Sequence, residues 1–550
     1  MEKNISYAKF NHDWGIHPVP PLPNVPVYNL LRDSAKKWPD QTALICYDKK
    51  LTYREVDELT DRLAWTLATV FGVKKGDRVA TMLPNCIQHS LAFFGIIKTG
   101  AIAVPCNVMY KPRELAYQLK DAEVETIIAL DVFYPVIKQA RKDTPLKNVI
   151  ITNLKDFTSP DAAVPSLFAI EKTKIPETSD LLELLEKSKA EAPPVEIHPE
   201  EDLALLLYTA GTTGVSKGVM ETHRNVWACA HPSRYILDLT ENTICLQIMP
   251  MFHCSGYCLA QLPVLYLGGT VVHVSLFDPV QCLGMIEKYK VNLIFAPPTF
   301  YIGLLASPEF GRYDLSSLKL TYSCGAPQPP ALRERWSSQV GCYLYDGYGL
   351  TETMCQGVSA LSTPKMKKPG AVGVVFGGEI KIVDENGEIV PRGVVGEIMF
   401  RGDGVAKGYW RKPRETAEAF TEDGWLHTGD AGYLDEEGFL HFVDRYKDLI
   451  IASGYNIAPS EVEGVILQHP AVKEAAVIGV PDEYRGETVK AFVSLKDGYK
   501  GKVTAEEIIA HCRENLAAFK VPRQITFLEE IPKNAVGKIL RRQLREMNDQ

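Results

Sequence analysis

The chain reads LALLLYTAGTTGVSKG from Leu203 to Gly218. Its first part, Leu203–Tyr208, is a continuous apolar run of strand length, and such runs are typical of parallel strands buried on both faces. The second part is rich in glycine and threonine and carries Lys217. Backbone amides, hydroxyls and a cation in such a turn can bind phosphate oxygens. The stretch therefore predicts an α/β protein with a phosphate-binding loop; a flexible loop without a ligand is the alternative.

The loop does not follow the common ATPase pattern G-x-x-x-x-G-K-[ST]. Ser216 precedes the lysine and Gly218 follows it. The glycine before the lysine and the magnesium-binding hydroxyl after it are therefore both missing, and an ATPase of that class is not predicted.

Strands and helices are predicted to alternate on the N-terminal side of this loop. Apolar runs at Arg78–Leu83, Ile102–Pro105 and Val124–Leu130 are typical of strands, whereas Ile87–Lys98 and Pro112–Asp121 are typical of helices. Strands that alternate with helices indicate βαβ units and largely parallel sheets.

The pattern changes after Ala371. Glu379–Val383 and Gly396–Phe400 are predicted strands with turn residues between them, which indicates a smaller β-rich subdomain. From Asp448 onward, further strands and the predicted helix Thr504–Leu516 indicate a compact α+β unit.

Composition limits the classes of function. The chain has 550 residues, enough for several packed units, and a net charge of -8, which argues against a nucleic-acid binder. The most membrane-like window, Cys258–Phe277, contains polar residues and a glycine pair, so we expect a helix end followed by a strand. Twelve scattered cysteines without CxxC spacing predict reduced thiols. Because no N-terminal signal is visible, we expect a cytoplasmic protein.

Several motifs resemble those of one superfamily, in the same order along the chain. Tyr208–Gly218 resembles the signature loop Y-T-S-G-T-T-G-x-P-K-G of the adenylate-forming superfamily, although Ala210 and Ser216 depart from it. The later motifs that match are Tyr348–Thr353, Trp425–Asp430, Asp444–Asp448, Ser453–Glu463 and Pro532–Arg542. The chain thus resembles an AMP-forming acyl-CoA synthetase, and Asn107–Leu115 looks most like the fatty acyl-CoA synthetase branch.

The resemblance implies an α/β fold in which residues 1–446 form a large N-terminal domain and residues 447–550 a small, mobile α+β domain. The large domain would contain two parallel-sheet α/β subdomains and a small β-rich subdomain. Lys447 would be the hinge, since a few residues at the end of an element can absorb the backbone change of a domain rotation.

The resemblance also assigns residues to the nucleotide and to coenzyme A. Tyr348 would pack on adenine, Thr351 would contact phosphate, and Asp430 and Arg445 would reach the ribose. The whole set implied for these co-substrates is Thr209, Gly211, Thr212, Thr213, Gly214, Lys217, Gly325, Ala326, Asp346, Gly347, Tyr348, Gly349, Thr351, Asp430, Arg445, Lys447, Ser453, Gly454, Tyr455 and Lys538.

The implied catalytic residues are Lys538, Thr213, Glu352 and His253. Lys538 would neutralise the charge that builds between the carboxylate and the α-phosphate. Glu352 and Thr213 would hold Mg²⁺, a hard cation that prefers oxygen ligands. His253, in the loop Pro250–His253, would gate entry of the acid; a core histidine is the alternative.

The implied function is ATP-dependent ligation of a carboxylic acid to coenzyme A through an acyl-adenylate, with release of AMP and pyrophosphate. The segments expected to line the acyl pocket, Trp227–Ala230, His253–Leu259 and Phe295–Tyr301, carry aromatic and small apolar side chains. Such a wall favours a medium- to long-chain fatty acid, because it would leave an amino group or a second carboxylate unpaired.

Other functions share these motifs and stay open here. They are an aryl-acid CoA ligase, an adenylation enzyme that passes the acyl group to a carrier protein, a luciferase-like oxygenase and a non-catalytic nucleotide-binding protein. A homodimer and a peripheral membrane contact are also left open, whereas no nucleic-acid partner is expected.

Overall fold

The computed structural model describes residues 5–6, 20–209, 216–326, 328–355, 358–359, 368–452, 455–482, 486–533 and 539–548. The chain divides into two compact units. The larger comprises Asn4–Ile380 and Phe400–Leu426, and the smaller comprises Met1–Lys3, Lys381–Met399 and His427–Gln550. Among the described helices, none is both long enough and apolar enough to cross a membrane.

The first sheet of the larger unit has seven strands in the order β10-β9-β5-β4-β6-β7-β8. Their bounds are β4 Arg78–Met82, β5 Ile102–Pro105, β6 Thr126–Leu130, β7 Asn148–Thr152, β8 Ser179–Asp180, β9 Leu203–Thr209 and β10 Lys217–Thr222. Neighbouring strands are parallel, except that β10 is antiparallel to β9. The helices of this region are α3 Tyr53–Thr69, α4 Ile87–Lys98, α5 Pro112–Asp121, α6 Tyr134–Ala140 and α7 Leu181–Lys187. The predicted βαβ units are thereby confirmed.

The second sheet has nine strands in the order β17-β16-β15-β14-β13-β11-β12-β2-β3. Their bounds are β2 Thr42–Cys46, β3 Lys49–Thr52, β11 Ile244–Gln247, β12 Thr270–His273, β13 Leu293–Ala296, β14 Leu320–Cys324, β15 Leu344–Tyr348, β16 Val358–Ser359 and β17 Val374–Val375. The strands from β2 to β15 are parallel, and β3, β16 and β17 join at the edges antiparallel.

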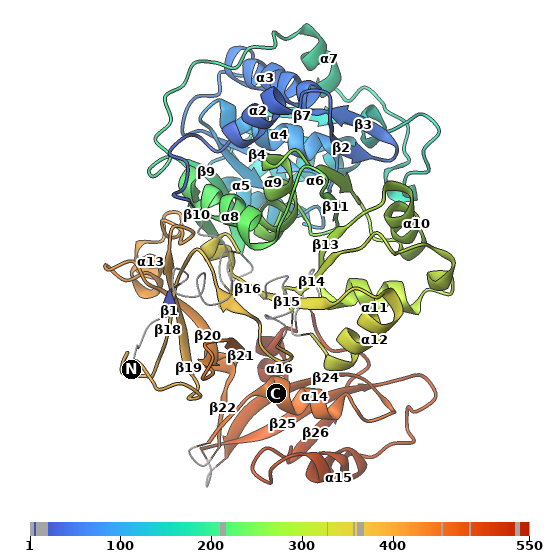
Figure 1. Ribbon diagram of the computed structural model, residues 1–550, viewed down its shortest axis with the longest axis vertical. Helices are drawn as coiled ribbons and strands as arrows, with labels where there is room; N and C mark the ends of the chain where they lie inside the picture. The colour runs from blue at the N-terminus through green and yellow to red at the C-terminus, as the bar shows by residue number, and fades with distance from the viewer. Residues whose placement is uncertain are drawn as a thin grey trace. The chain divides into compact units, whose positions relative to one another are not determined.

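The larger unit has further helices, of which α9, α11 and α12 contact strands of this second sheet (Figure 1). Their bounds are α2 Asn29–Lys37, α8 His223–Ile236, the π-helix η5 Gly256–Gln261, α9 Leu262–Tyr266, α10 Pro279–Tyr289, α11 Pro298–Ala306 and α12 Pro330–Val340. Because η5 and α9 are followed by β12, the predicted helix end and strand within Cys258–Phe277 are confirmed.

Helix α4 is buried along its whole length and packs on α3. Its last residue, Lys98, is a buried cation, and its ammonium donates to Asp57 Oδ1 and Asp61 Oδ1 of α3, both at 2.6 Å. A third bond reaches Thr60 Oγ1 at 2.8 Å. A buried ammonium is tolerated only when it is paired and hydrogen-bonded in this way.

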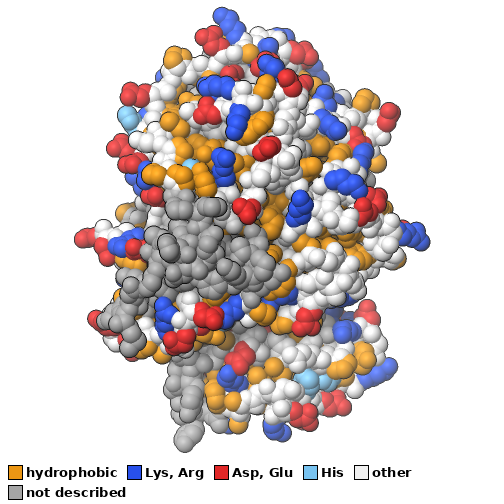
Figure 2. Space-filling view, in the orientation of Figure 1, with side chains coloured by type: hydrophobic (Ala, Val, Ile, Leu, Met, Phe, Trp, Pro, Cys, Tyr) orange, Lys and Arg blue, Asp and Glu red, His pale blue; other side chains and the backbone are white. Residues whose placement is uncertain are grey.

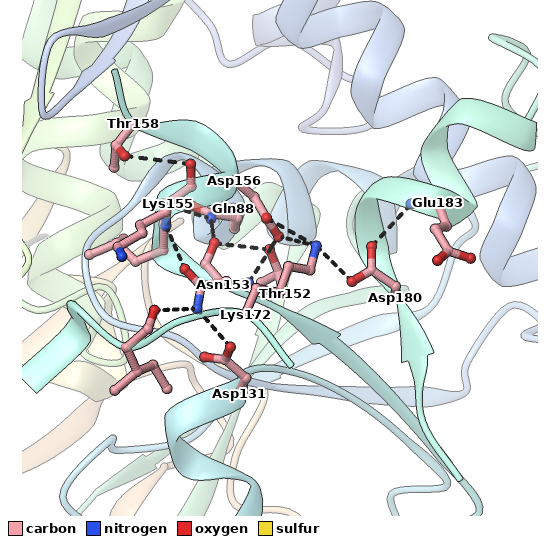
Figure 3. A network of polar contacts seen from close by, with 12 residues as sticks. Gln88, Asp131, Thr152, Asn153, Lys155, Asp156, Thr158, Lys172, Asp180 and Glu183 are labelled. Atoms are coloured by element: carbon pink, nitrogen blue, oxygen red, sulfur yellow. Dashed lines mark hydrogen bonds and ion pairs between the residues drawn. The ribbon is translucent and has the colours of Figure 1, made fainter. Parts of the chain in front are cut away.

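A polar network closes the β7–β8 edge of the first sheet (Figure 3). The Asn153 side chain donates to Asp131 Oδ2 at 2.7 Å, and the Asn153 backbone N–H donates to Asp156 Oδ2 at 2.9 Å. Lys172 pairs with Asp156 at 3.0 Å and with Asp180 at 2.7 Å. Few residues between β7 and α7 belong to a strand, and these side-chain contacts hold that part of the chain in place.

A five-stranded sheet has the order β1-β18-β19-β20-β21. Its bounds are β1 Ile5–Ser6, β18 Gly378–Val383, β19 Gly396–Gly402, β20 Leu426–Leu434 and β21 Leu440–Arg445. Helix α13, Pro413–Ala419, lies between β19 and β20 in the sequence. The predicted β-rich subdomain after Ala371 corresponds to this sheet.

The C-terminal part of the smaller unit is an α+β fold, as predicted. Its sheet has the order β23-β22-β25-β24, and β26 pairs parallel with β25. The elements are β22 Ile450–Ala452, β23 Tyr455–Ile457, α14 Pro459–Ile466, β24 Val472–Asp482, β25 Gly486–Leu495, α15 Ala505–Asn515, β26 Gln524–Phe527 and α16 Arg541–Asn548. Apolar residues of β24 and β25 pack against α14 and α15 to form the core.

Lys and Arg side chains alternate with Asp and Glu over the visible face of the larger unit (Figure 2). Some form exposed ion pairs, such as Lys36 with Asp33 and Arg54 with Asp40. Pairs of this kind contribute little to stability because water and salt screen them.

Candidate active site

Strands β9 and β10 hold the two ends of the predicted phosphate loop. Thr209, the last residue of β9, lies opposite Lys217, the first residue of β10. Gly211, Thr212, Thr213 and Gly214, predicted to bind phosphate, lie outside the described residues. The antiparallel register therefore brings the two described ends of the loop together.

Ser216 replaces the proline of the signature loop, and the structure gives its side chain a partner. Its hydroxyl donates to the backbone oxygen of Thr209. Its own backbone oxygen accepts a hydrogen bond from the Tyr117 hydroxyl at 2.9 Å. A proline has no hydroxyl, so this closure of the loop base is specific to the residue found here.

Tyr409 brings Lys217 and Glu352 to one side chain. The Lys217 ammonium lies 4.8 Å from the centre of the Tyr409 ring, within the range of a cation–π contact. The Tyr409 hydroxyl donates to Glu352 Oε1 at 3.0 Å. The structure therefore places the loop lysine and the predicted magnesium ligand on the same tyrosine.

The segment that carries Tyr409 is fixed against β10 and Glu352 by backbone hydrogen bonds. The Trp410 N–H donates to the oxygen of Gly218 at 2.7 Å, and the Ala406 N–H donates to the oxygen of Glu352 at 2.9 Å. Sequence reasoning missed Tyr409, because it lies outside every motif and its partners are distant along the chain.

Glu352 lies in a short 3-10 helix, η7 Thr351–Thr353, that follows β15. Gly349 precedes it at a point where a Cβ atom would lie 2.8 Å from the backbone oxygen of Cys355. Only glycine fits that approach without a shift of the backbone. The turn that presents Thr351 and Glu352 therefore depends on Gly349.

Glu221 of β10 is a second carboxylate near Glu352 that sequence reasoning missed. Burial, together with the nearby Cys254 and Glu352, raises the pKa of Glu221 well above its usual value. Neither of its carboxylate oxygens has a hydrogen-bond partner among the residues that the structure describes. The available signal was the period-two pattern of β10, which puts Glu221 on the same buried face as Val219.

Strands β14 and β15 end side by side at the predicted adenine site. Ser323 pairs with Asp346 and Cys324 pairs with Gly347 in parallel register. Gly325 and Ala326, exposed, and Tyr348, half-buried, therefore lie at the carboxyl ends of neighbouring strands. Ligands of open α/β sheets bind at this edge.

Asp346 is paired with a residue of its own unit. The Arg333 guanidinium of α12 contacts Asp346 Oδ2, and both side chains are largely buried. Burial raises the pKa of Asp346 to about 6, although Arg333 opposes that rise. The Asp346 carboxylate, which the motif predicts to bind the nucleotide, is thus already paired with Arg333.

His253 is half-buried and interacts with the residues that follow it. The Ser255 N–H donates to His253 Nδ1 at 3.2 Å, and the Ser255 hydroxyl lies 2.8 Å from the same atom. Cys254 Sγ lies 3.4 Å from the same nitrogen. Cys254 Sγ lies 3.5 Å from Thr351 Oγ1, so the predicted gate and the predicted phosphate contact are neighbours.

In the smaller unit, the register of β20 and β21 pairs the two predicted ribose residues. Asp430 lies opposite Arg445, and Arg445 Nη1 is 2.7 Å from Asp430 Oδ1. The Asp430 side chain is 3% exposed and that of Arg445 is 33% exposed, so the pair has one accessible member.

The predicted hinge residue, Lys447, lies in a one-turn 3-10 helix, Tyr446–Asp448. Contacts connect the chain before and after it. The Ser460 N–H donates to Asp444 Oδ2 at 2.9 Å, and the Ser460 hydroxyl donates to the oxygen of Val443 at 2.8 Å. Arg541 of α16 lies 3.6 Å from Asp444 Oδ1 and bonds to Glu463 Oε1 at 2.7 Å.

Three of the predicted residues of the C-terminal motifs, Ser453, Gly454 and Lys538, lie outside the described residues. Tyr455 begins β23. Within the last motif, Lys533 forms an antiparallel bridge with Ile539, and the Leu540 N–H donates to the oxygen of Pro532 at 2.9 Å.

Comparison with known proteins adds an independent observation. The family described as "AMP-binding enzyme" matches residues 31–410, and "AMP-binding enzyme C-terminal domain" matches residues 461–538. A long-chain-fatty-acid–CoA ligase of Bacillus subtilis (strain 168) is 42% identical over 543 residues, which cover 96% of this chain and 95% of that protein.

Solved structures resemble the fold over nearly its full length. The anthranilate CoA ligase AuaEII in complex with anthranoyl-AMP has a TM-score of 0.85 and 29% identity, covering 96% of this chain and 98% of that one. ATP-bound MatB from Rhodopseudomonas palustris has a TM-score of 0.83 and 28% identity, covering 96% and 99%.

Proposed function

Because this chain belongs to the AMP-binding enzyme family, we propose that it joins a medium- to long-chain fatty acid to coenzyme A. The fatty acid carboxylate attacks the α-phosphorus of ATP, which gives an acyl-adenylate and pyrophosphate. The thiol of coenzyme A then attacks the acyl carbon, and AMP leaves. The observation that carries this proposal is the 42% identity to a long-chain-fatty-acid–CoA ligase over nearly the full length of both chains.

The larger unit supplies groups suited to the first step. Lys217 and Glu352 meet at Tyr409, which puts a cation and a carboxylate beside the ends of the phosphate loop. Mg²⁺ commonly uses one or two carboxylates together with phosphate oxygens and water, so the Glu352 carboxylate fits it. When bound, Mg²⁺ would neutralise phosphate charge. The role of Tyr409 is to orient the Glu352 carboxylate.

We expect Glu352→Gln to raise the Mg²⁺ concentration needed for half-maximal rate several-fold. A neutral amide is a poorer ligand for a hard cation than a carboxylate, while its oxygen can still accept the Tyr409 hydrogen bond. Titration of adenylate formation with Mg²⁺ measures this. Tyr409→Phe, which removes the orienting bond but keeps the carboxylate, should raise the requirement less. An unchanged Mg²⁺ dependence in Glu352→Gln would exclude Glu352 as a ligand.

The segments assigned to the acyl pocket meet around η5. Helix α8, which contains Trp227–Ala230, and strand β13 both contact η5. Cys229 Sγ lies 3.0 Å from the backbone oxygen of Cys258, which joins α8 and η5 directly. The side chains there are largely apolar and buried, which supports a fatty acyl chain as the substrate tail.

We expect kcat/KM to rise with each methylene of a saturated fatty acid until the pocket is filled. Burial of one methylene contributes about 0.8 kcal/mol, or roughly a fourfold gain per carbon. Pyrophosphate release across a series of fatty acids measures this, with benzoic and anthranilic acids as the aryl comparison. Turnover confined to acetate, amino acids or dicarboxylates would contradict the proposed substrate.

The acceptor and the compartment are part of the same proposal. Detection of acyl-CoA as the product, with no light emission, distinguishes the ligase from a carrier-protein adenylation enzyme and from an oxygenase. The twelve cysteines are scattered without CxxC spacing, which supports a reducing compartment such as the cytoplasm.

A further inference from the structure

Two cysteine thiols from distant parts of the chain are in contact in the larger unit. Cys254, which directly precedes Ser255 and η5, and Cys355, which follows η7, have Sγ atoms 3.1 Å apart. A disulfide bond is about 2.05 Å long, so the two sulfur atoms need to move only a short distance towards each other to form one. Cys254 is buried and Cys355 is half-buried.

The backbone around Cys355 holds its thiol in this position. Met354 and Cys355 have φ angles of 47° and 53°, in the left-handed region that residues other than glycine rarely adopt. The Cys355 N–H donates to the oxygen of Leu350 at 2.8 Å, which closes the turn. Successive left-handed residues cost free energy, and such strain is concentrated at functional sites.

The two thiols differ in their acidity. Burial by itself raises the pKa of Cys254, but the hydrogen bond from Cys355 and the imidazole of His253 lower it well below its usual value. The hydrogen bond to Cys254 and burial raise the pKa of Cys355. Burial also raises the pKa of cysteines elsewhere, such as Cys46 and Cys106. A thiolate beside a thiol is the arrangement that reacts with an oxidant and then closes a disulfide.

We propose that Cys254 and Cys355 form a reversible disulfide on exposure to hydrogen peroxide, and that this bond stops the ligase. The Cys254 thiolate attacks one peroxide oxygen, the O–O bond breaks, and hydroxide takes up a proton to leave as water. The Cys355 sulfur then attacks the resulting sulfenic acid, the S–O bond breaks, and a second water leaves. Two thiols are oxidised and one peroxide is reduced.

The position of Cys254 and Cys355 explains why a disulfide between them would inhibit the ligase. Cys254 is the residue after His253 and lies 3.5 Å from Thr351 Oγ1, and Cys355 follows η7, which carries Glu352. A covalent bond between these segments fixes the His253 loop against the turn that presents Thr351 and Glu352. The inhibition rests on the proposed ligase function, whereas the disulfide itself does not.

In the test, the full-length protein is treated with hydrogen peroxide, and the Cys254–Cys355 disulfide and the ligase activity are measured separately. Peptide mass mapping without reductant should find the Cys254 and Cys355 peptides joined. The rate of acyl-CoA formation should fall about tenfold or more, since displacement of a site by about an ångström can cost this much. Dithiothreitol should restore both readings.

Matched variants make the test specific. Cys355→Ser and Cys254→Ser should each keep most of their own untreated rate after peroxide, whereas Cys46→Ser, at a buried cysteine of β2, should stay sensitive. Equal inactivation of Cys355→Ser and the parent protein, or no joined peptides after inactivation, would overturn the proposal. A joined pair with an undiminished rate would overturn its regulatory part. If the untreated protein ligates no acid, the proposed function fails, and the mass mapping still decides the disulfide.

Discussion

Replacement of Lys538 by alanine is expected to slow acyl-adenylate formation by about 10²–10³-fold, the range seen when one electrostatic stabiliser of a transition state is removed. Negative charge gathers as the carboxylate approaches the α-phosphate, and a lysine ammonium offsets it only if it stands close to both. We assign this role to Lys538 from its motif. Within that motif, the described residues Lys533 and Ile539 form an antiparallel bridge.

The half-reactions separate the role of Lys538 from a loss of folding. Pyrophosphate release without coenzyme A measures adenylation, and thioester formation from supplied acyl-adenylate measures the second step. Lys538→Ala should impair the first and largely spare the second. Lys533→Ala is the matched control, because Lys533 belongs to the same motif but is paired with Glu474. Equal losses in both half-reactions of Lys538→Ala would refute the assignment.

Replacement of Lys447 by proline is expected to abolish most thioester formation while adenylate still forms. Proline fixes φ and removes the backbone donor, so a rotation centred on this residue would no longer be accessible. If the C-terminal segment must rotate between the two steps, only the second step should be lost.

The same two assays, applied to Lys447→Pro and Lys447→Ala, measure the effect. The alanine variant removes a side chain that is itself predicted to contact a co-substrate but keeps a flexible backbone, so it should retain far more thioester formation than the proline variant. Near-normal rates of both steps in the proline variant would place the hinge elsewhere.

Local sequence signals predicted much of the fold. Helices α4 and α5 begin and end at the predicted residues, since Pro112 suits a helix start and glycines or polar residues interrupt the apolar runs. The turn between α9 and β12 follows from Gly268, whose φ of 81° requires glycine. Each of these features depends on residues close together in the sequence.

Contacts between distant segments were not predictable in the same way. Tyr409 reaches Glu352 and Lys217 only because the chain after β19 returns to β10. Glu221 was overlooked because a carboxylate buried among cysteines contradicts the usual hydrophobic pattern of a strand. The contact of Cys254 with Cys355 likewise depends on tertiary packing. The motifs predicted the candidate site residues, whereas the residues that contact them could be identified only from the tertiary structure.

Ser460 and Arg541 contact Asp444 and Val443, and these contacts oppose a rotation of the C-terminal segment. They therefore lower the apparent affinity of any ligand that binds only after this rotation. A chain that pivots at Lys447 must release all of them, and a hydrogen bond to a charged group, such as that from the Ser460 N–H to Asp444, contributes about 1.5–3 kcal/mol. The released arrangement would then be a minor population in the absence of other contacts. A ligand that binds only this population has an apparent affinity reduced by its fraction. The measured affinity for coenzyme A would therefore include the free energy of freeing Asp444 as well as that of the coenzyme A contacts.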